Sequence, residues 1–293
     1  MRVRQDAAVR RLGLAVVTWV AAMALAGCGT VTQTVGDASE YTDGAEFPEF
    51  EITEEDSRTV AGDAAEIIDL SSVNGDIKIA DGGDYVLSGG SDCRVIVDSD
   101  EDPVHLFLNG VRIEEKEGCA VLVMSASKIV ITCMDGTENV IGDSAYYGES
   151  KDYDACIYSF ADMTINGGGT LRVTGLYEDA IRSKDIVKVI GTELEVKAKG
   201  DGIRGNDGVC ILDSKALVEA EKNGIRTSKN GHDVKGSVEI SGSEASVIAG
   251  KYAIESYDML MVSGSSLYLN GVLGKWQVAG DVFVEEGNVS GGR

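Results

Sequence analysis

The chain has 293 residues, of which 49 are acidic and 26 are lysine or arginine, giving a formal net charge of -23. This charge argues against binding nucleic acid by phosphate neutralisation, and two histidines leave little material for imidazole catalysis. The 37 glycines show no Gly-X-Y period, and valine, isoleucine and leucine are frequent, which excludes collagen and disordered chains. The composition instead predicts an all-β protein rich in small and β-branched residues.

The N-terminus has the pattern of an export signal. Residues 1–27 combine a basic start with an apolar run, as a secretory signal peptide does. The run ends in Leu25-Ala-Gly-Cys28, which looks like a bacterial lipobox, with an ordinary signal peptide and a chance cysteine as the alternative. We therefore expect an exported protein, lipid-anchored through Cys28 to the outer face of a bacterial membrane. Residues 28–65 are acidic without an apolar period and are predicted to form a tether.

Five further cysteines are odd in number and have no CxxC or CxxH spacing. They are Cys93, Cys119, Cys133, Cys156 and Cys210. Neither a disulfide framework nor a zinc site follows from this arrangement. We interpret most of them as small apolar core residues, and a single disulfide remains an alternative.

A repeat of about 22 residues is the strongest signal in the chain. Each copy is a short segment built around an isoleucine. The five isoleucines follow one another in steps of 24, 22, 22 and 29 residues and are Ile157, Ile181, Ile203, Ile225 and Ile254. A step of this size suits one coil of three short strands with tight turns. We therefore predict an all-β fold, a right-handed parallel β-helix over residues 66–287.

The charge pattern fixes the register between neighbouring coils. In residues 193–199 polar side chains alternate with apolar ones, the period-2 pattern of a half-buried strand. A shift of 22 residues places Lys215 on Glu193 and Glu219 on Lys197, so the outward charges change sign from coil to coil. A slip by one residue would destroy both the charge pattern and the apolar pattern.

Several segments stand in an order and spacing that resemble a known family. They lie between about residues 66 and 272 and include Gly83–Gly89, Leu108–Ile113, Lys128–Thr132, Gly136–Asn139, Ile157–Ser159 and Met163–Leu171. The chain resembles secreted bacterial carbohydrate-binding β-helix proteins with a pectate-lyase-like fold. The resemblance implies calcium together with cellulose or acidic sugars such as polygalacturonate. Asn223, Tyr252 and Lys229 depart from the acidic pattern of the earlier coils, so a row of calcium ions would be broken there.

One column of the predicted coils is acidic. Asp179 stacks on Asp201, and Asp185 stacks on Asp207. Two carboxylates about 5 Å apart repel each other by roughly 1 kcal/mol in water and by more at a lower dielectric. Calcium, which binds six to eight oxygens with flexible geometry, would offset this repulsion. The alternative is that these aspartates are turn residues that bind their own backbone and are neutralised by nearby arginine and lysine.

A second column is basic. Arg182, Arg204 and Arg226 follow one another, with Tyr158 below and Glu255 above. A polyuronate carries one carboxylate per sugar, and a guanidinium can bind a carboxylate with two hydrogen bonds. These arginines, together with Tyr158, are therefore candidates for binding an acidic glycan. The alternative is that the flanking aspartates neutralise them.

Tyrosines near the same coils are candidates for stacking on sugar rings. Tyr153 and Tyr177 lie one coil apart, and each precedes an acidic turn. Tyr146 and Tyr147 lie in the same loop as Tyr153. The alternative is that these are ordinary exposed tyrosines near turns.

Three functions fit these patterns. The first is a non-catalytic, monomeric surface lipoprotein that binds polysaccharide, acidic or from plant cell walls, with calcium as a candidate cofactor. The second is a polysaccharide lyase of the pectate type, in which Arg204 or Lys184 would act as the base. The third is a surface spacer or protein-interaction scaffold. No serine-hydrolase elbow, phosphate loop or HExxH motif supports other catalysis.

Overall fold

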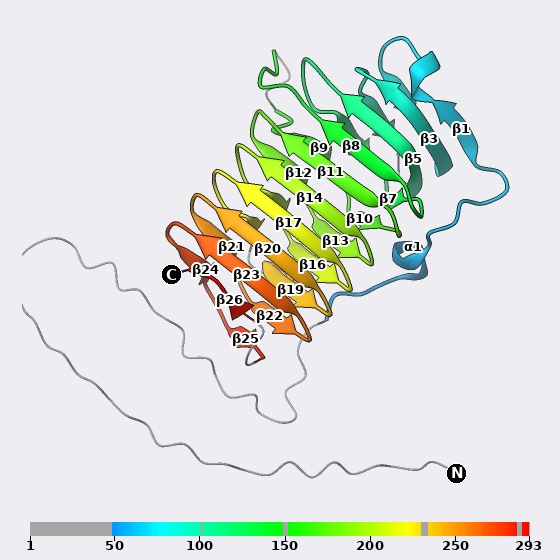
Figure 1. Ribbon diagram of the computed structural model, residues 1–293. Helices are drawn as coiled ribbons and strands as arrows, with labels where there is room; N and C mark the ends of the chain where they lie inside the picture. Colours follow the sequence, from blue (N-terminus) through cyan, green and yellow to red (C-terminus); the bar gives the residue numbers. More distant parts are fainter. Residues whose placement is uncertain (1–48, 101, 149–151, 230–233, 286–288, 293) are drawn as a thin grey trace, which may run out of the picture. The chain divides into compact units, whose positions relative to one another are not determined.

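The computed structural model describes residues 49–100, 102–148, 152–229, 234–285 and 289–292. These residues form a parallel β-solenoid whose coils are stacked along one axis (Figure 1). The expected signal peptide, Cys28 and the first part of the tether lie outside the described residues. Within the described residues, no helix is long and apolar enough to cross a membrane.

The coils have three strands, and we number the resulting faces in chain order within a coil. Face 1 is a nine-stranded sheet in the described residues. Its strands are β2 (Ile77–Ile79), β4 (Val95–Asp98), β6 (Val121–Ser125), β9 (Ala155–Ser159), β12 (Asp179–Ser183), β15 (Ile203–Gly205), β18 (Ile225–Thr227), β21 (Tyr252–Ser256) and β24 (Gly274–Val278). The isoleucines of the repeat pair in register along this face, so the predicted all-β solenoid and its coil length are confirmed.

Faces 2 and 3 belong to one 17-stranded sheet, because the long strands β3 and β5 run through both faces. The strands of face 2 are β1 (Glu66–Asp69), β3 (Gly83–Ser91), β5 (Val104–Glu114), β7 (Ile129–Cys133), β10 (Met163–Asn166), β13 (Ile186–Ile190), β16 (Gly208–Leu212), β19 (Ser237–Ser241), β22 (Leu260–Ser263) and β25 (Val282–Val284). The strands of face 3 are β8 (Glu138–Gly142), β11 (Thr170–Gly175), β14 (Glu193–Ala198), β17 (Lys215–Ala220), β20 (Glu244–Ala249), β23 (Ser266–Gly271) and β26 (Val289–Ser290). The pairing of β26 with β23 carries the solenoid past the predicted end at residue 287.

The core fills the inside of the coils with stacked aliphatic side chains. Ile181, Ile203 and Ile225 are fully buried and pair one above the other. On face 3 the predicted charge register is confirmed, with Lys215 Nζ 2.8 Å from Glu193 and Lys197 Nζ 3.3 Å from Glu219. Period-2 alternation in each strand therefore separates the apolar inside from the charged outside.

The corner between faces 2 and 3 needs a left-handed backbone in successive coils. The residues at this corner are Gly191 (φ 58°), Asp213 (φ 47°), Gly242 (φ 59°) and Gly264 (φ 53°). Glycine adopts this conformation without steric cost, and aspartate tolerates it better than most residues. The sequence therefore marks the tight turn in each of these coils.

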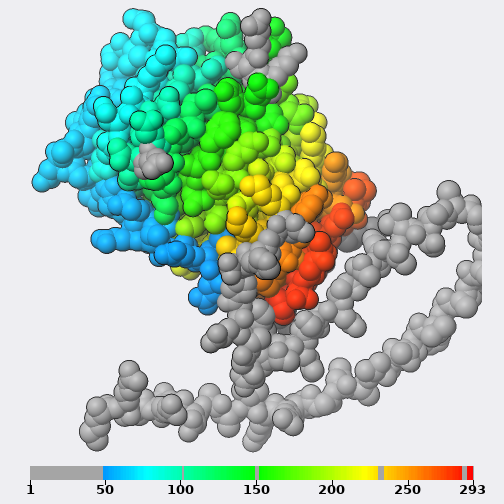
Figure 2. All heavy atoms as spheres, turned by 180° about the vertical axis from the view of Figure 1, so that it is seen from behind, coloured from blue at the N-terminus to red at the C-terminus, as the bar shows by residue number. Residues whose placement is uncertain are grey.

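Residues 49–62 do not form a tether but lie across face 2, and we call this segment the strap (Figure 1). Its Phe50 is buried against Gly208 of β16. Its short helix α1 (Glu54–Ser57) begins with a capping box, in which Thr53 and Asp56 bind each other's backbone amides. The space-filling view shows the blue N-terminal part of the described chain packed against the body of the solenoid (Figure 2). This corrects the predicted tether for residues 49–62, whose acidic composition gave no sign of a docked segment.

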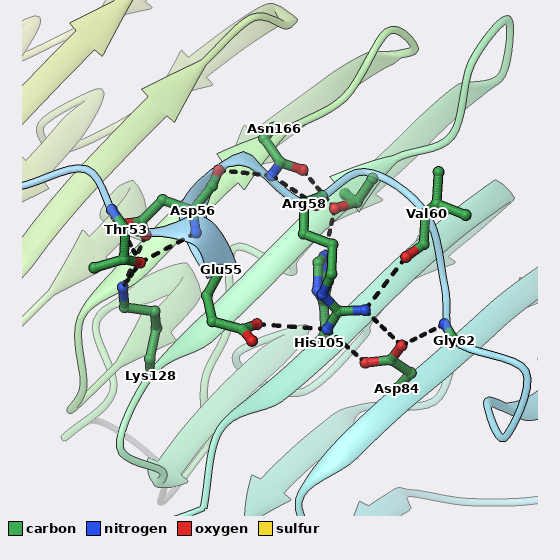
Figure 3. A network of polar contacts seen from close by, with 11 residues as sticks. Thr53, Glu55, Asp56, Arg58, Val60, Gly62, Asp84, His105, Lys128 and Asn166 are labelled. Atoms are coloured by element: carbon green, nitrogen blue, oxygen red, sulfur yellow. Dashed lines mark hydrogen bonds and ion pairs between the residues drawn. The ribbon is translucent and has the colours of Figure 1, made fainter.

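A buried carboxylate fastens the strap (Figure 3). Asp56 is 0% exposed and forms ion pairs with Lys128 Nζ at 3.0 Å and Lys188 Nζ at 2.9 Å. It also accepts a hydrogen bond from Thr164 Oγ1, while Asn166 Nδ2 donates to the Asp56 carbonyl oxygen. These partners lie 72 to 132 residues away in the sequence. The chain itself therefore occupies the outward side of face 2 between Asp84 of β3 and Gly208 of β16.

The five cysteines after Cys28 are all buried and free of disulfide bonds. Burial raises the pKa of the Cys119 thiol above its ordinary value, and it raises that of Cys133 to about 12. A thiol that stays protonated is a poor nucleophile. These cysteines therefore act as small core residues.

Candidate functional site

Face 1 carries the arginine column on its outward side, opposite the buried isoleucines. We call Arg182, Arg204 and Arg226 the arginine ladder. The strand register places Tyr158 of β9 directly below Arg182 and Glu255 of β21 directly above Arg226. The three guanidinium groups therefore come from adjacent strands, at the roughly 4.8 Å spacing of paired strands.

Each arginine of the ladder reaches back to an aspartate of the preceding coil. Arg182 forms an ion pair with Asp154. Arg204 Nη1 lies 3.7 Å from Asp179 Oδ2, and Arg226 Nη1 lies 3.0 Å from Asp201 Oδ2. The same arginine–aspartate ion pair is thus repeated three times along face 1, and each pair links two successive coils.

Arg226 is the most completely paired member of the ladder. Its Nε also lies 2.8 Å from Glu255 Oε2, so its guanidinium bridges a carboxylate from the coil below and one from the coil above. The side chain is 25% exposed. Although burial lowers the pKa of Arg226, the hydrogen bond and charge of Asp201 raise it above the ordinary value overall.

Arg204 is the least completely paired member. Its Nε donates a hydrogen bond to the neutral Ser228 Oγ at 2.9 Å. The corresponding Nε of Arg226 instead lies beside the carboxylate of Glu255. Its 3.7 Å separation from Asp179 is the longest ion pair of the ladder. Burial and the like charge of Arg182 lower the pKa of Arg204. The middle of the ladder therefore holds a cation with spare capacity to bind an anion.

The acidic column pairs with backbone amides and with these arginines. Asp179 Oδ1 accepts a hydrogen bond from the Asp201 amide at 2.7 Å, and Asp201 Oδ1 accepts from the Asn223 amide at 2.9 Å. Burial, followed by the charge of Asp201, raises the pKa of Asp179 to about 7. The carboxylates thus stabilise the turn of the following coil, as the turn alternative expects.

In the second acidic pair, only Asp207 is neutralised by lysines. Asp207 forms ion pairs with Lys229 at 2.8 Å and Lys235 at 3.1 Å. Asp185 is not part of these pairs, and its pKa is raised by burial and by the charges of Asp162 and Asp207. No group of three or more acidic, cysteine or histidine side chains arranged for a metal ion occurs in the described residues. With these cations already in place, the stacked aspartates do not fit calcium and its six to eight oxygen ligands.

The tyrosines pack mainly on one another. Tyr158 is 1% exposed beneath Arg182, whose Cζ lies 5.5 Å from the ring centre, so the expectation that this ring contacts a ligand is corrected. Tyr153 is half-buried against the edge of Tyr158, with ring centres 5.6 Å apart. Tyr177 is also half-buried and stacks on the buried Tyr147 at 4.2 Å. Among the tyrosines that the sequence offered for sugars, Tyr146 instead keeps most of its surface open, since it is 71% exposed.

The sequence interpretation missed two exposed aromatic residues beside face 1. Phe160 is 40% exposed and Tyr257 is 41% exposed. Each follows directly after a paired strand of face 1, so the two occupy the same position in different coils, with Lys184 in that position in a coil between them. The repeat could have identified both residues, because each lies three residues after an isoleucine of the repeat. These rings, rather than Tyr158, flank the arginine ladder with surface open to solvent.

A buried acid holds the neighbouring loop. Asp143 is 5% exposed, accepts hydrogen bonds from the Leu176 amide at 2.6 Å and from the Tyr147 hydroxyl, and has no ion pair in the described residues. Burial raises the pKa of Asp143 from 3.8 to about 6.

We expect this carboxyl to make the folded protein more stable in mild acid. A group whose pKa is higher in the folded state stabilises it below the unfolded pKa and loses this effect as pH rises through the folded value. Between pH 4 and 7, the free energy of unfolding should therefore lose about 2 kcal/mol of stabilisation from Asp143. Urea denaturation across this pH range gives the free energy of unfolding of the wild type and of Asp143→Asn, and the difference between the two proteins measures this contribution. An equal pH dependence of both proteins would contradict it.

The comparisons with known proteins bear directly on this site. The model of the family described as carbohydrate-binding domain-containing protein matches residues 73–286, which include every coil of the arginine ladder. The chain belongs to this family. A carbohydrate-binding domain-containing protein of Acetivibrio thermocellus is 34% identical to it over 135 residues, or 44% of this chain and 47% of the relative. The chain thus spans about half the length of that relative.

A solved structure supports the same assignment for this carbohydrate-binding domain. The polysaccharide lyase-like protein from C. thermocellum, studied as a gadolinium derivative, superposes with a TM-score of 0.71 at 27% identity. The match covers 78% of this chain and 99% of the other. The predicted resemblance to carbohydrate-binding β-helix proteins is therefore confirmed.

Proposed function

We propose that this carbohydrate-binding domain holds an acidic polysaccharide against face 1 without cleaving it. The observation that carries the proposal is the in-register stack of three guanidinium groups whose middle member, Arg204, has the weakest carboxylate pairing. A glycan lying along the solenoid axis would present one uronate carboxylate to Arg204. Phe160 and Tyr257 supply exposed rings that can stack on sugars at either end.

The geometry favours binding over lysis. Abstraction of the proton next to a uronate carboxylate needs a base whose pKa lies near the working pH. Arg204 keeps its charge, because a guanidinium is protonated in proteins even when burial lowers its pKa. Lys184 Nζ lies 5.8 Å from the ring centre of Tyr158, within the range of a cation–π contact. Arg204 is therefore a poor general base, which favours binding over lysis.

The proposal is tested by titrating the protein with galacturonic acid oligomers in a calorimeter. We expect Arg204→Gln to weaken binding by about 1.5–3 kcal/mol, the contribution of a hydrogen bond to a charged group. Binding should also weaken with salt, because exposed charges are screened within about 10 Å at 0.1 M. Neutral cello-oligosaccharides of the same length serve as the uncharged ligand.

Arg172→Gln is the matched control variant, because Arg172 lies on face 3 and pairs with Glu138 and Glu195. It should bind the oligomers as the wild type does. Equal affinity of a folded Arg204→Gln variant would remove face 1 as the binding site. Ultraviolet absorbance of an unsaturated product during the titration would instead support the lyase.

The proposal also places the domain on the cell surface. Its support is the sequence of the first 28 residues, with a basic start, an apolar run and the final Leu25-Ala-Gly-Cys28. Lipid attached to Cys28 would hold the protein at the membrane without spanning it. Replacing Cys28 by serine should release the protein from membranes, as fractionation of cells would show.

A further inference from the structure

We propose that the arginine ladder takes the place of a bound metal ion on face 1, so that the site receives its acidic ligand without calcium. This inference rests on the proposed function for its ligand, but the part that concerns the metal is tested without any glycan. It rests on where the guanidinium groups lie relative to the stacked carboxylates.

The arginines occupy the position that a cation would need. Asp201 Oδ2 and Glu255 Oε2 come from different coils, and the guanidinium of Arg226 lies between them at 3.0 and 2.8 Å. Asp201 Oδ1 is used by the Asn223 amide and by Asn223 Nδ2. Both oxygens of Asp201 are therefore engaged by donors of the protein. A calcium ion at this point would have to displace Arg226.

The same relation repeats one coil below. Arg204 lies over Asp179, whose Oδ1 is engaged by the Asp201 amide. The side chain of Asp179 is only 5% exposed, so it offers little surface to an ion from solution. At the corner towards face 2, Lys229 and Lys235 hold both oxygens of Asp207. Each of these carboxylates thus faces a cation of the chain, although Asp179 Oδ2 has only the 3.7 Å ion pair with Arg204 and no hydrogen bond.

The positive charge of an arginine side chain depends on solution conditions less than that of a bound metal ion does. Calcium would bring its charge only where the free ion is abundant and the site is deprotonated. A guanidinium keeps its charge at all ordinary pH values and cannot be removed by a chelator. The ladder therefore supplies permanent positive charge for a carboxylate of the ligand.

The first experiment measures the melting temperature of the wild type, Arg226→Ser and Arg172→Ser in demetallated buffer with chelator and in buffer with calcium. We expect the wild type and Arg172→Ser to melt at the same temperature in both buffers. Arg226→Ser exposes the carboxylates of Asp201 and Glu255 to each other, so calcium should raise its melting temperature by several degrees. Arg204→Ser provides a second variant of the same kind at Asp179, in case Arg226→Ser does not fold.

The outcomes separate the two proposals. A wild-type melting temperature that falls in chelator would overturn the inference, as would folded serine variants that gain no response to calcium. In the second experiment, wild-type affinity for galacturonic acid oligomers should agree within about twofold with and without chelator, and loss of binding in chelator alone would again overturn it. Absence of oligomer binding in both buffers would overturn the proposed function, while the melting experiment would still decide the inference about the metal.

Discussion

Replacing Asp56 by alanine should lower the free energy of unfolding by about 3–5 kcal/mol, the cost of removing one partner from a buried ion pair. The carboxylate is 0% exposed, and the side chain of Lys188, its partner, is only 6% exposed. Alanine would leave the Lys188 ammonium buried without a counter-ion and Thr164 without its acceptor. Urea denaturation measures the loss.

The stability of the fold at acidic pH should also depend on Asp56. Burial by itself would raise the pKa of Asp56, but hydrogen bonds from Thr164, Thr53, Lys188 and Lys128 hold it well below its usual value. A depressed pKa means that the carboxylate stabilises the fold above the unfolded pKa and loses this effect only in strong acid. Asp56 should therefore fasten the strap throughout the pH range in which the protein is handled.

Asp63→Ala is the matched control, because Asp63 follows the strap and is exposed. It should change stability by no more than about 0.5 kcal/mol. Limited proteolysis tests the strap itself, because in Asp56→Ala a protease should cut the strap while the solenoid stays intact. Equal stability of the two variants would show that the strap does not depend on its buried carboxylate.

Replacing Ile203 by alanine should cost about 2–5 kcal/mol, the range for large-to-small changes in a packed core. Ile203 is fully buried at the middle of the isoleucine column, between Ile181 and Ile225. Each coil of a solenoid contacts only its neighbours, so the cavity weakens the stacking of coils on both sides. The midpoint of urea denaturation measures the effect.

Leu217→Ala is the control for this change, since it removes the same number of carbon atoms. Leu217 lies on the outward side of β17 and is 40% exposed. We expect it to cost less than about 1 kcal/mol, because most of its surface change occurs in water. Similar losses in the two variants would contradict the assignment of Ile203 to the core.

The repeat in the amino-acid sequence was enough to predict the solenoid, its register and the columns on its faces. The step of 22 residues places Lys215 beside Glu193 and Arg204 between Arg182 and Arg226, and the structure has both arrangements. The physical reason is repetition. Parallel strands of equal period stack in register, so contacts between coils become a fixed offset in the sequence, and a slip of one residue would turn every apolar side chain outward.

The partners that these side chains take could not be predicted from the repeat and are seen only in the folded chain. Whether Asp201 faces a metal ion or Arg226, and whether the ring of Tyr158 is open or covered by Arg182, depends on side-chain directions that no period records. The strap is the clearest case, because Asp56 meets Lys188 across 132 residues. Such a contact lies outside the repeat, and it forms because burying several polar and apolar partners together outweighs the entropy lost in ordering the segment.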